Sequence, residues 1–128
     1  MSDALIDSAA KAKHDLGKYI AFQSRWLPDD AGVEDWTQAL RSDLMETRRG
    51  PDGSEGAVEI WARLKPDFAT LQGDPDIHQI DGAMLRIGAG LPYLESGGLD
   101  LPALHTMAED ARCVATHLAA LHRRLKEG

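Results

Sequence analysis

Four side chains near the start of the sequence have the types and the spacing needed for a chemical step. His14 and Asp15 are adjacent, while Lys11 precedes His14 by three residues and Lys18 follows it by four. On a helix these spacings place both lysines on the face of the histidine, which points away from the apolar stripe and toward solvent. Neutral imidazole is a nucleophile, and ammonium groups stabilise a phosphoryl group through charge-assisted hydrogen bonds. This arrangement favours phosphoryl transfer through His14.

The segment His14-Asp15-Leu16 resembles the phosphoacceptor helix of histidine kinases, in which an acid and then a leucine follow the histidine. It is also similar to the histidine-x-leucine-lysine-glycine motif of histidine-phosphotransfer (HPt) domains, although Gly17-Lys18 reverses the last two residues. The resemblance implies an all-α bundle that accepts a phosphoryl group on His14 from a response-regulator receiver domain. It further implies that Asp15 acts as a hydrogen-bond acceptor or base and that Lys18 neutralises the phosphate. The chain has no room for an ATP-binding domain, so we expect a carrier rather than a kinase.

A second set of polar residues, Glu109, Cys113 and His117, stands at four-residue spacing and would share one helix face. Such donors suit zinc, but a four-coordinate site needs a further ligand from another helix. The same positions flank an expected core face, where a small cysteine and a neighbouring histidine are ordinary. We predict no metal site and no cofactor, because the Glu-x-x-His, His-Glu-x-x-His and glycine-loop motifs are missing from the sequence. The remaining histidines form no recognisable set: His78, His105, His117 and His122.

The composition is that of one globular domain spanning residues 1–128, with 43% hydrophobic and 27% charged residues. A net charge of −7 argues against nucleic acid and anionic membranes as partners. No apolar run approaches the roughly 20 residues of a membrane-spanning helix. Cys113 is the only cysteine, and the first residues carry acids and lysines where a secretory signal would be apolar. We therefore expect a cytoplasmic protein.

Apolar residues recur at alternating three- and four-residue spacing along the chain, which is the pattern of amphipathic helices. The pattern and its flanking signals predict helices over 3–27, 31–49, 53–72, 75–95 and 101–127. Short connections favour antiparallel packing of consecutive helices. The expected fold is therefore all-α, an up-and-down antiparallel bundle of four to five helices.

Local signals support these boundaries. Helix starts are indicated by three acidic caps: Asp52 with Glu55, Asp74 before Pro75, and Asp100 before Pro102. Pro66 removes a helical hydrogen bond and predicts a kink or split in the third helix. Glycines and a proline over 88–92 weaken the end of the fourth helix, and residues 96–98 form a loop.

Large aromatic residues are expected to anchor the core: Tyr19, Trp26, Trp36, Trp61 and Phe68. Small residues on the first and last helices allow close helix approach and a seam between subunits: Ala9, Ala12, Ala111, Ala115 and Ala119. The leading hypothesis is a protein with no catalytic activity of its own that binds a protein partner or self-associates. That hypothesis predicts a contiguous exposed apolar patch. The alternative is the phosphorelay carrier that uses His14.

Overall fold

Every regular element in the part of the chain that the structure describes is a helix. The computed structural model describes residues 3–17, 41, 44–45, 56–71 and 73–127. The elements with full bounds are α1 (Asp3–Gly17), α3 (Ala57–Leu64), the 3₁₀ helix η2 (Lys65–Leu71), α4 (Pro75–Glu95) and α5 (Leu101–Glu127). These ranges include no strand, which confirms the predicted all-α class. No helix among them is both long and apolar enough to cross a membrane.

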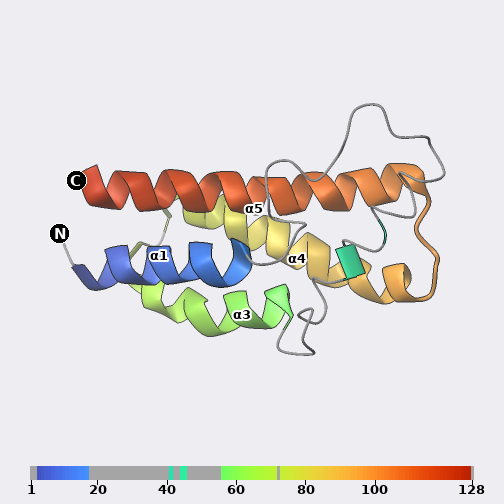
Figure 1. Ribbon diagram of the computed structural model, residues 1–128, viewed down its shortest axis with the longest axis horizontal. Coiled ribbons are helices and arrows are strands. Elements are labelled where there is room, and N and C mark those ends of the chain that lie inside the picture. Colours follow the sequence, from blue (N-terminus) through green and yellow to red (C-terminus); the bar gives the residue numbers. More distant parts are fainter. Residues whose placement is uncertain (1–2, 18–40, 42–43, 46–55, 72, 128) are drawn as a thin grey trace.

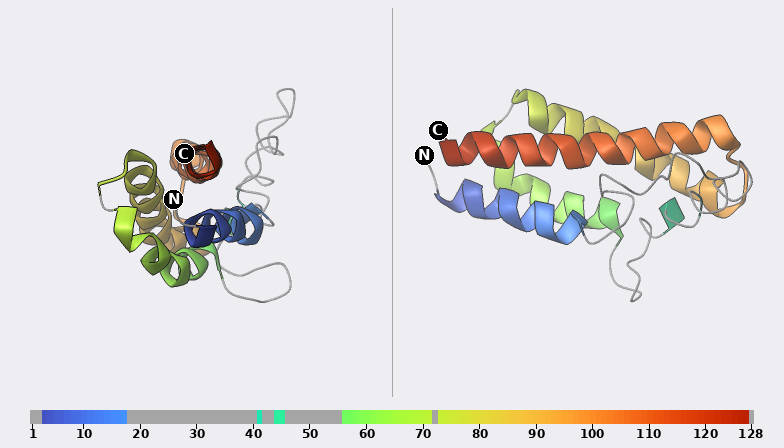
Figure 2. Two further views of the ribbon diagram at one scale, coloured as in Figure 1. Left: turned by 90° about the vertical axis from the view of Figure 1, so that its left-hand side faces the viewer. Right: turned by 45° about the horizontal axis from the view of Figure 1, so that its top comes forward.

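The helices form an up-and-down bundle. In Figure 1, α1 and α4 run in one direction while α3 and α5 return in the other. The end-on view in Figure 2 places α5 beside both α1 and α4, with α3 closing the opposite side between them. Helices that follow one another, α3 with α4 and α4 with α5, are therefore antiparallel, as the short connections predicted.

The core consists of the apolar stripes that the helices turn toward one another. Trp61 and Phe68 are both buried, and their rings stack with centroids 6.0 Å apart, which confirms them as core anchors. Tyr19, Trp26 and Trp36 lie outside the described residues. The largest side chains that are fully buried are mostly aliphatic: Leu16, Leu44, Ile80, Met84, Ile87, Leu94, Leu104, Leu121 and Val114.

Two of the predicted helix caps are formed. One oxygen of Asp74 accepts hydrogen bonds from the backbone N–H groups of Asp76 and Ile77, at 2.9 and 3.2 Å. Asp100 accepts one from the backbone N–H of Ala103 at 3.0 Å. These side chains satisfy N–H groups that have no partner within the helix. The observed starts of α4 and α5 therefore agree with the predicted positions 75 and 101.

The Asp100 cap provides a test of this local reasoning. We expect Asp100→Ala to lower the free energy of unfolding by about 1 kcal/mol, because an N–H group at the start of α5 loses its acceptor. Asp100→Asn keeps a side-chain oxygen and serves as the control. Urea denaturation followed by circular dichroism measures both variants, and equal losses in the two would contradict the cap.

The predicted start of the third helix is wrong, whereas the predicted break in its middle is confirmed. It begins at Ala57, four residues after the expected position 53, because Gly56 is extended, with φ −77° and ψ 168°. The Asp52–Glu55 pair lies outside the described residues, as do residues 18–27 and most of 31–49. The α-helix ends at Leu64 and η2 begins at Lys65, next to Pro66, whose missing N–H removes a helical hydrogen bond. Within η2, Phe68 departs from helical geometry.

The end of α4 is regular despite its glycines and proline. The helix continues to Glu95, and Gly90 accounts for part of its packing because a side chain there would collide with the terminal methyl of Met107 on α5. The predicted loop then follows. Gly97 adopts a φ of 77°, and the N–H groups of Gly97 and Gly98 donate to carbonyls of the last helical turn. This pattern closes the helix and reverses the chain into α5.

Candidate functional site

A groove lies between α3 and α4 on the described part of the molecule. We call it the α3/α4 groove. It contains two adjoining cavities of about 400 and 410 Å³, each within the size range of ligand and peptide sites. The first is lined by Val58, Trp61, Ala62, Lys65, Asp81, Met84, Leu85, Gly88 and Ala89. The second is lined by Val58, Glu59, Gly88, Leu91, Pro92 and Glu95.

The two cavities meet at Gly88 and Val58, which line both. A methyl group added at Gly88 would lie 3.6 Å from a methyl of Val58, so it would occupy the junction without a clash. The lack of a side chain at Gly88 therefore keeps the groove continuous. The two cavities therefore form one continuous groove rather than two separate pockets.

One end of the groove carries an ion pair held in a fixed geometry. The indole N–H of Trp61 donates to one carboxylate oxygen of Asp81 at 3.1 Å, and the ammonium group of Lys65 donates to the other at 3.0 Å. Burial alone would raise the pKa of Asp81, but the hydrogen bonds from Trp61 and Lys65 outweigh it and hold that pKa below its ordinary value. Asp81 is therefore ionised with both oxygens engaged, which suits binding rather than proton transfer.

Beside the groove, α4 exposes apolar side chains. Among the residues that the structure describes, Leu85 and Tyr93 are large apolar residues with exposures of 69% and 61%. Ala89 lies between them at four-residue spacing and is also exposed, so the three form a stripe along one face. The opposite face of α4 is buried in the core. This helix is apolar on two sides, and among the described residues the core packs against only one of them.

The structure confirms that His14 faces solvent. Its side chain is 87% exposed, and Nδ1 lies 3.2 Å from a carboxylate oxygen of Asp15. Lys11 is exposed on the same helix, whereas Lys18 lies outside the described residues. The predicted pair of His14 and Asp15 is therefore formed. Lys18, which was expected to neutralise a phosphate on His14, lies outside the described residues.

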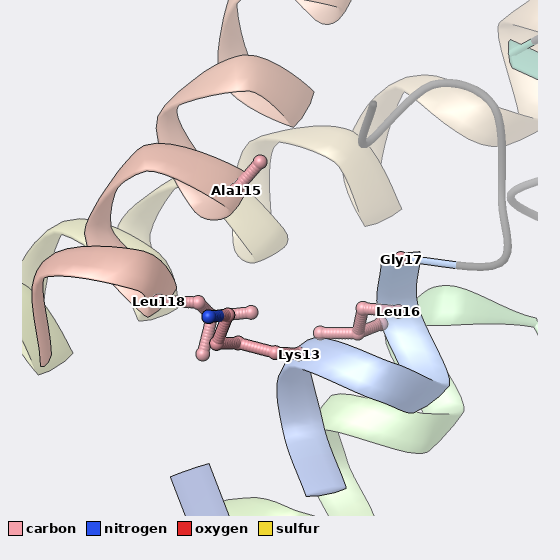
Figure 3. A pocket seen from close by; sticks show the side chains of 5 residues that line it. All are labelled: Lys13, Leu16, Gly17, Ala115 and Leu118. Carbon is pink, nitrogen blue, oxygen red and sulfur yellow. The ribbon is translucent and has the colours of Figure 1, made fainter. Parts of the chain in front are cut away.

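Lys13 contacts the neighbouring helix. Its ammonium nitrogen lies 3.4 Å from Nδ1 of His122 on α5. Partial burial, then the charges of Lys13 and Lys126, lower the pKa of His122. Lys13 and Leu118 also line a cavity between α1 and α5, shown in Figure 3, with a volume of only about 110 Å³. Because ligand pockets usually exceed about 300 Å³, this cavity is too small for a cofactor.

A polar network that the sequence did not suggest ties α4 to α5. Nδ1 of His117 lies 2.7 Å from Asp76, and the guanidinium of Arg124 donates to Asp76 at 2.9 Å and to Asp74 at 2.8 and 2.9 Å. Burial alone would raise the pKa of Asp76, but hydrogen bonds from His117 and Arg124 lower it. His117 and Arg124 are seven residues apart on α5, which is two helical turns. This spacing is the sequence feature that could have indicated that both side chains lie on one face.

The Glu109–Cys113–His117 spacing does not assemble a metal site. His117 is directed to Asp76, and the thiol of Cys113 lies 4.0 Å from the side-chain oxygen of Gln79. Burial raises the pKa of Cys113, so the thiol stays protonated. Within the ranges that the structure describes, no group of three or more His, Cys, Asp or Glu side chains could hold a metal ion.

The small residues expected to form a seam are divided between the core and the surface. Ala9, Ala12 and Ala111 are fully buried and pack the bundle together, whereas Ala115 is partly buried and Ala119 is exposed. Among the described residues, the large exposed apolar side chains lie on α4. Comparison with protein-family models, with curated proteins and with solved structures gives no match to this chain.

Proposed function

We propose that this chain is a helical-bundle binding protein that holds another polypeptide in the α3/α4 groove. The observation that carries the proposal is Leu85, which is 69% exposed at the edge of a cavity of about 400 Å³. Burying a leucine side chain is worth about 1.5–3 kcal/mol, and the core does not use this one. A single exposed leucine is common on protein surfaces, but an apolar stripe beside a concave apolar site indicates an interaction surface.

The rest of the groove supports binding of a polypeptide. Its walls are mostly aliphatic or aromatic, and its polar groups are confined to the ends, with Lys65 and Asp81 at one and Glu59 and Glu95 at the other. Apolar surface supplies affinity, while charges at the ends set the direction of the bound segment. We place this function in the cytoplasm, since the free thiol of Cys113 suits a reducing compartment.

Site-specific photocrosslinking in expressing cells tests the proposal. A photoreactive phenylalanine at position 85 is expected to give an adduct with a discrete polypeptide, whereas the same group at exposed Arg112 on α5 should give none. Ala62→Arg, which fills the groove wall, should abolish the adduct. Ala119→Arg, the same change at an exposed position on α5, should leave it intact. An adduct that survives Ala62→Arg, or no adduct at position 85, would overturn the proposal.

A second function is favoured by the exposure of His14. If Nδ1–H donates to Asp15, the lone pair on Nε2 faces solvent and can attack the phosphorus of an aspartyl phosphate on a receiver domain. An N–P bond then forms, the acyl phosphate O–P bond breaks, and the receiver carboxylate leaves. Incubation with a radiolabelled phospho-receiver should yield an acid-labile label on the chain that His14→Gln removes and His122→Gln retains. An unlabelled chain would end this second proposal.

A further inference from the structure

Lys13 and His122 form a contact between α1 and α5 that has no acidic member. The ammonium nitrogen of Lys13 lies 3.4 Å from Nδ1 of His122. An ammonium group can only donate, so Nδ1 must carry a lone pair, and the ring must be neutral, for this hydrogen bond to form. Figure 3 shows the side chain of Lys13 extending from α1 toward α5, where it lines a small cavity together with Leu118. The contact is therefore compatible with only one charge state of the histidine.

The charged groups that face His122 favour that neutral state. Lys13 reaches the ring from α1, and Lys126 follows His122 by four residues on α5, which is a contacting spacing on a helix. Partial burial and then the two ammonium groups lower the pKa of His122, because each of them disfavours a positive charge on the ring. The ring is therefore harder to protonate in the folded chain than in water.

The acidic side chains that α4 presents to this end of α5 are bound to other partners. Asp74 and Asp76 accept hydrogen bonds from Arg124, and Asp76 also contacts His117. Within the described part of the chain, no carboxylate forms an ion pair with either lysine that faces the ring. No negative charge is therefore positioned there to stabilise a protonated imidazole.

The contact borders a helix that buries little apolar surface. The buried residues of α1 are Ala9, Ala12 and Leu16, and an alanine has only one methyl group to bury. Lys13 directly follows Ala12, so the polar contact lies at the margin of the buried stripe. The packing of α1 on α5 therefore depends more on its bordering polar contacts than the packing of a helix with a large apolar face would.

We propose that His122 makes the packing of α1 on α5 dependent on pH, because a proton on His122 weakens this packing and loss of the proton restores it. Protonation replaces the lone pair of Nδ1 with a second N–H group, so the hydrogen bond from Lys13 is lost. It also brings a positive charge to within 3.4 Å of the ammonium group, and the two cations repel. The coupling is reciprocal: since Lys13 belongs to α1, movement of α1 away from α5 makes His122 easier to protonate.

The direction of the pKa shift gives the sign of the effect. The pKa of His122 is lower in the folded chain than its ordinary value of about 6.5, so the unfolded chain takes up this proton more readily. The stabilising contribution is therefore full well above about pH 6.5, decreases as pH falls through that value, and becomes constant below the folded-state pKa. Carboxyl groups titrate near pH 4, so their effect falls in a different pH range.

An NMR titration of the imidazole protons in the full chain measures the first consequence. In Lys13→Gln, which removes the charge and keeps a long polar side chain, the pKa of His122 should rise toward its ordinary value. Lys11→Gln is the matched control, since Lys11 is an exposed lysine on the same helix, and it should change this pKa less. An equal pKa shift in the two variants, or no shift in Lys13→Gln, would overturn the proposal.

Hydrogen exchange of the α1 amides measures the second consequence. His122→Gln keeps a side-chain oxygen that can accept from Lys13 but cannot be protonated in this range. Dividing the wild-type exchange rate by the rate in His122→Gln at each pH removes the intrinsic pH dependence of exchange. This ratio should rise about 1.4- to 5-fold between about pH 7.5 and about pH 5, which corresponds to the roughly 0.2–1 kcal/mol of a surface charge contact. A ratio that stays constant, or that falls on acidification, would show that His122 does not control the packing of α1.

Discussion

Replacing Leu121 with alanine is expected to lower the free energy of unfolding by about 2–5 kcal/mol. Leu121 has no exposed surface and lies on α5, the helix that packs against both α1 and α4. The substitution removes apolar contacts and leaves a cavity that the surrounding helices can close only in part. Small domains have total stabilities of about 5–15 kcal/mol, so this single change removes a large fraction. Urea denaturation followed by circular dichroism measures the loss.

Leu85→Ala is the matched control, because it deletes the same atoms from a leucine that is 69% exposed. At a protein concentration where the chain is monomeric, its effect should stay within about 0.5 kcal/mol. The comparison distinguishes a leucine whose burial stabilises the fold from a leucine whose side chain is mostly exposed to solvent. A loss at position 85 as large as that at position 121 would show that Leu85 is part of the core, contrary to its exposure.

The second large effect on the free energy of unfolding is expected from the contacts of Asp76 with His117 and Arg124, and this effect depends on pH. Asp76→Asn removes the charge that His117 and Arg124 bind, and should cost about 2 kcal/mol at neutral pH. This is less than a fully buried pair would lose, because Arg124 is 47% exposed and solvent screens part of the interaction. The side chain of Asp76 is only 14% exposed, so part of the loss should persist in high salt.

The pH dependence has a definite sign. Because the folded-state pKa of Asp76 is lowered, its stabilising contribution is fully present above the unfolded-state value, about 3.9, and is lost as pH falls through the lower folded-state value. The difference in unfolding free energy between wild type and Asp76→Asn should therefore be constant above about pH 5 and shrink below about pH 4. Asp81, whose pKa is also lowered, is present in both proteins, and its effect cancels in the difference. A difference that grows on acidification would contradict the network.

The helices were predictable where an apolar stripe and a cap signal coincide. The expected spans 75–95 and 101–127 match Pro75–Glu95 and Leu101–Glu127, because Asp74 and Asp100 cap helices whose buried faces are long and regular. The start of α3 was misplaced because an acid pair at 52 and 55 looked like a cap. The observed helix instead starts after the extended Gly56, which makes no side-chain cap hydrogen bond.

The site was less predictable than the fold, because its residues do not carry a motif. Leu85 and Tyr93 do not belong to the apolar stripe of α4 that faces the core. Their exposure becomes evident only once the structure shows which face of α4 the other helices cover. The solvent-facing position of His14 followed from the periodicity alone. The His117–Arg124 contacts with Asp76 depend on the relative register of two helices, which one sequence does not specify.

The two apolar faces of α4 have a consequence for how this protein can change over evolutionary time. Ile80, Met84 and Ile87 face the core and hold the helix in place. The outward stripe contributes little to the stability of the fold, so under the proposed function substitutions there are selected for binding and not for folding. Descendants of this chain can therefore acquire new specificity by exchanging a few outward side chains, while the scaffold beneath them stays the same.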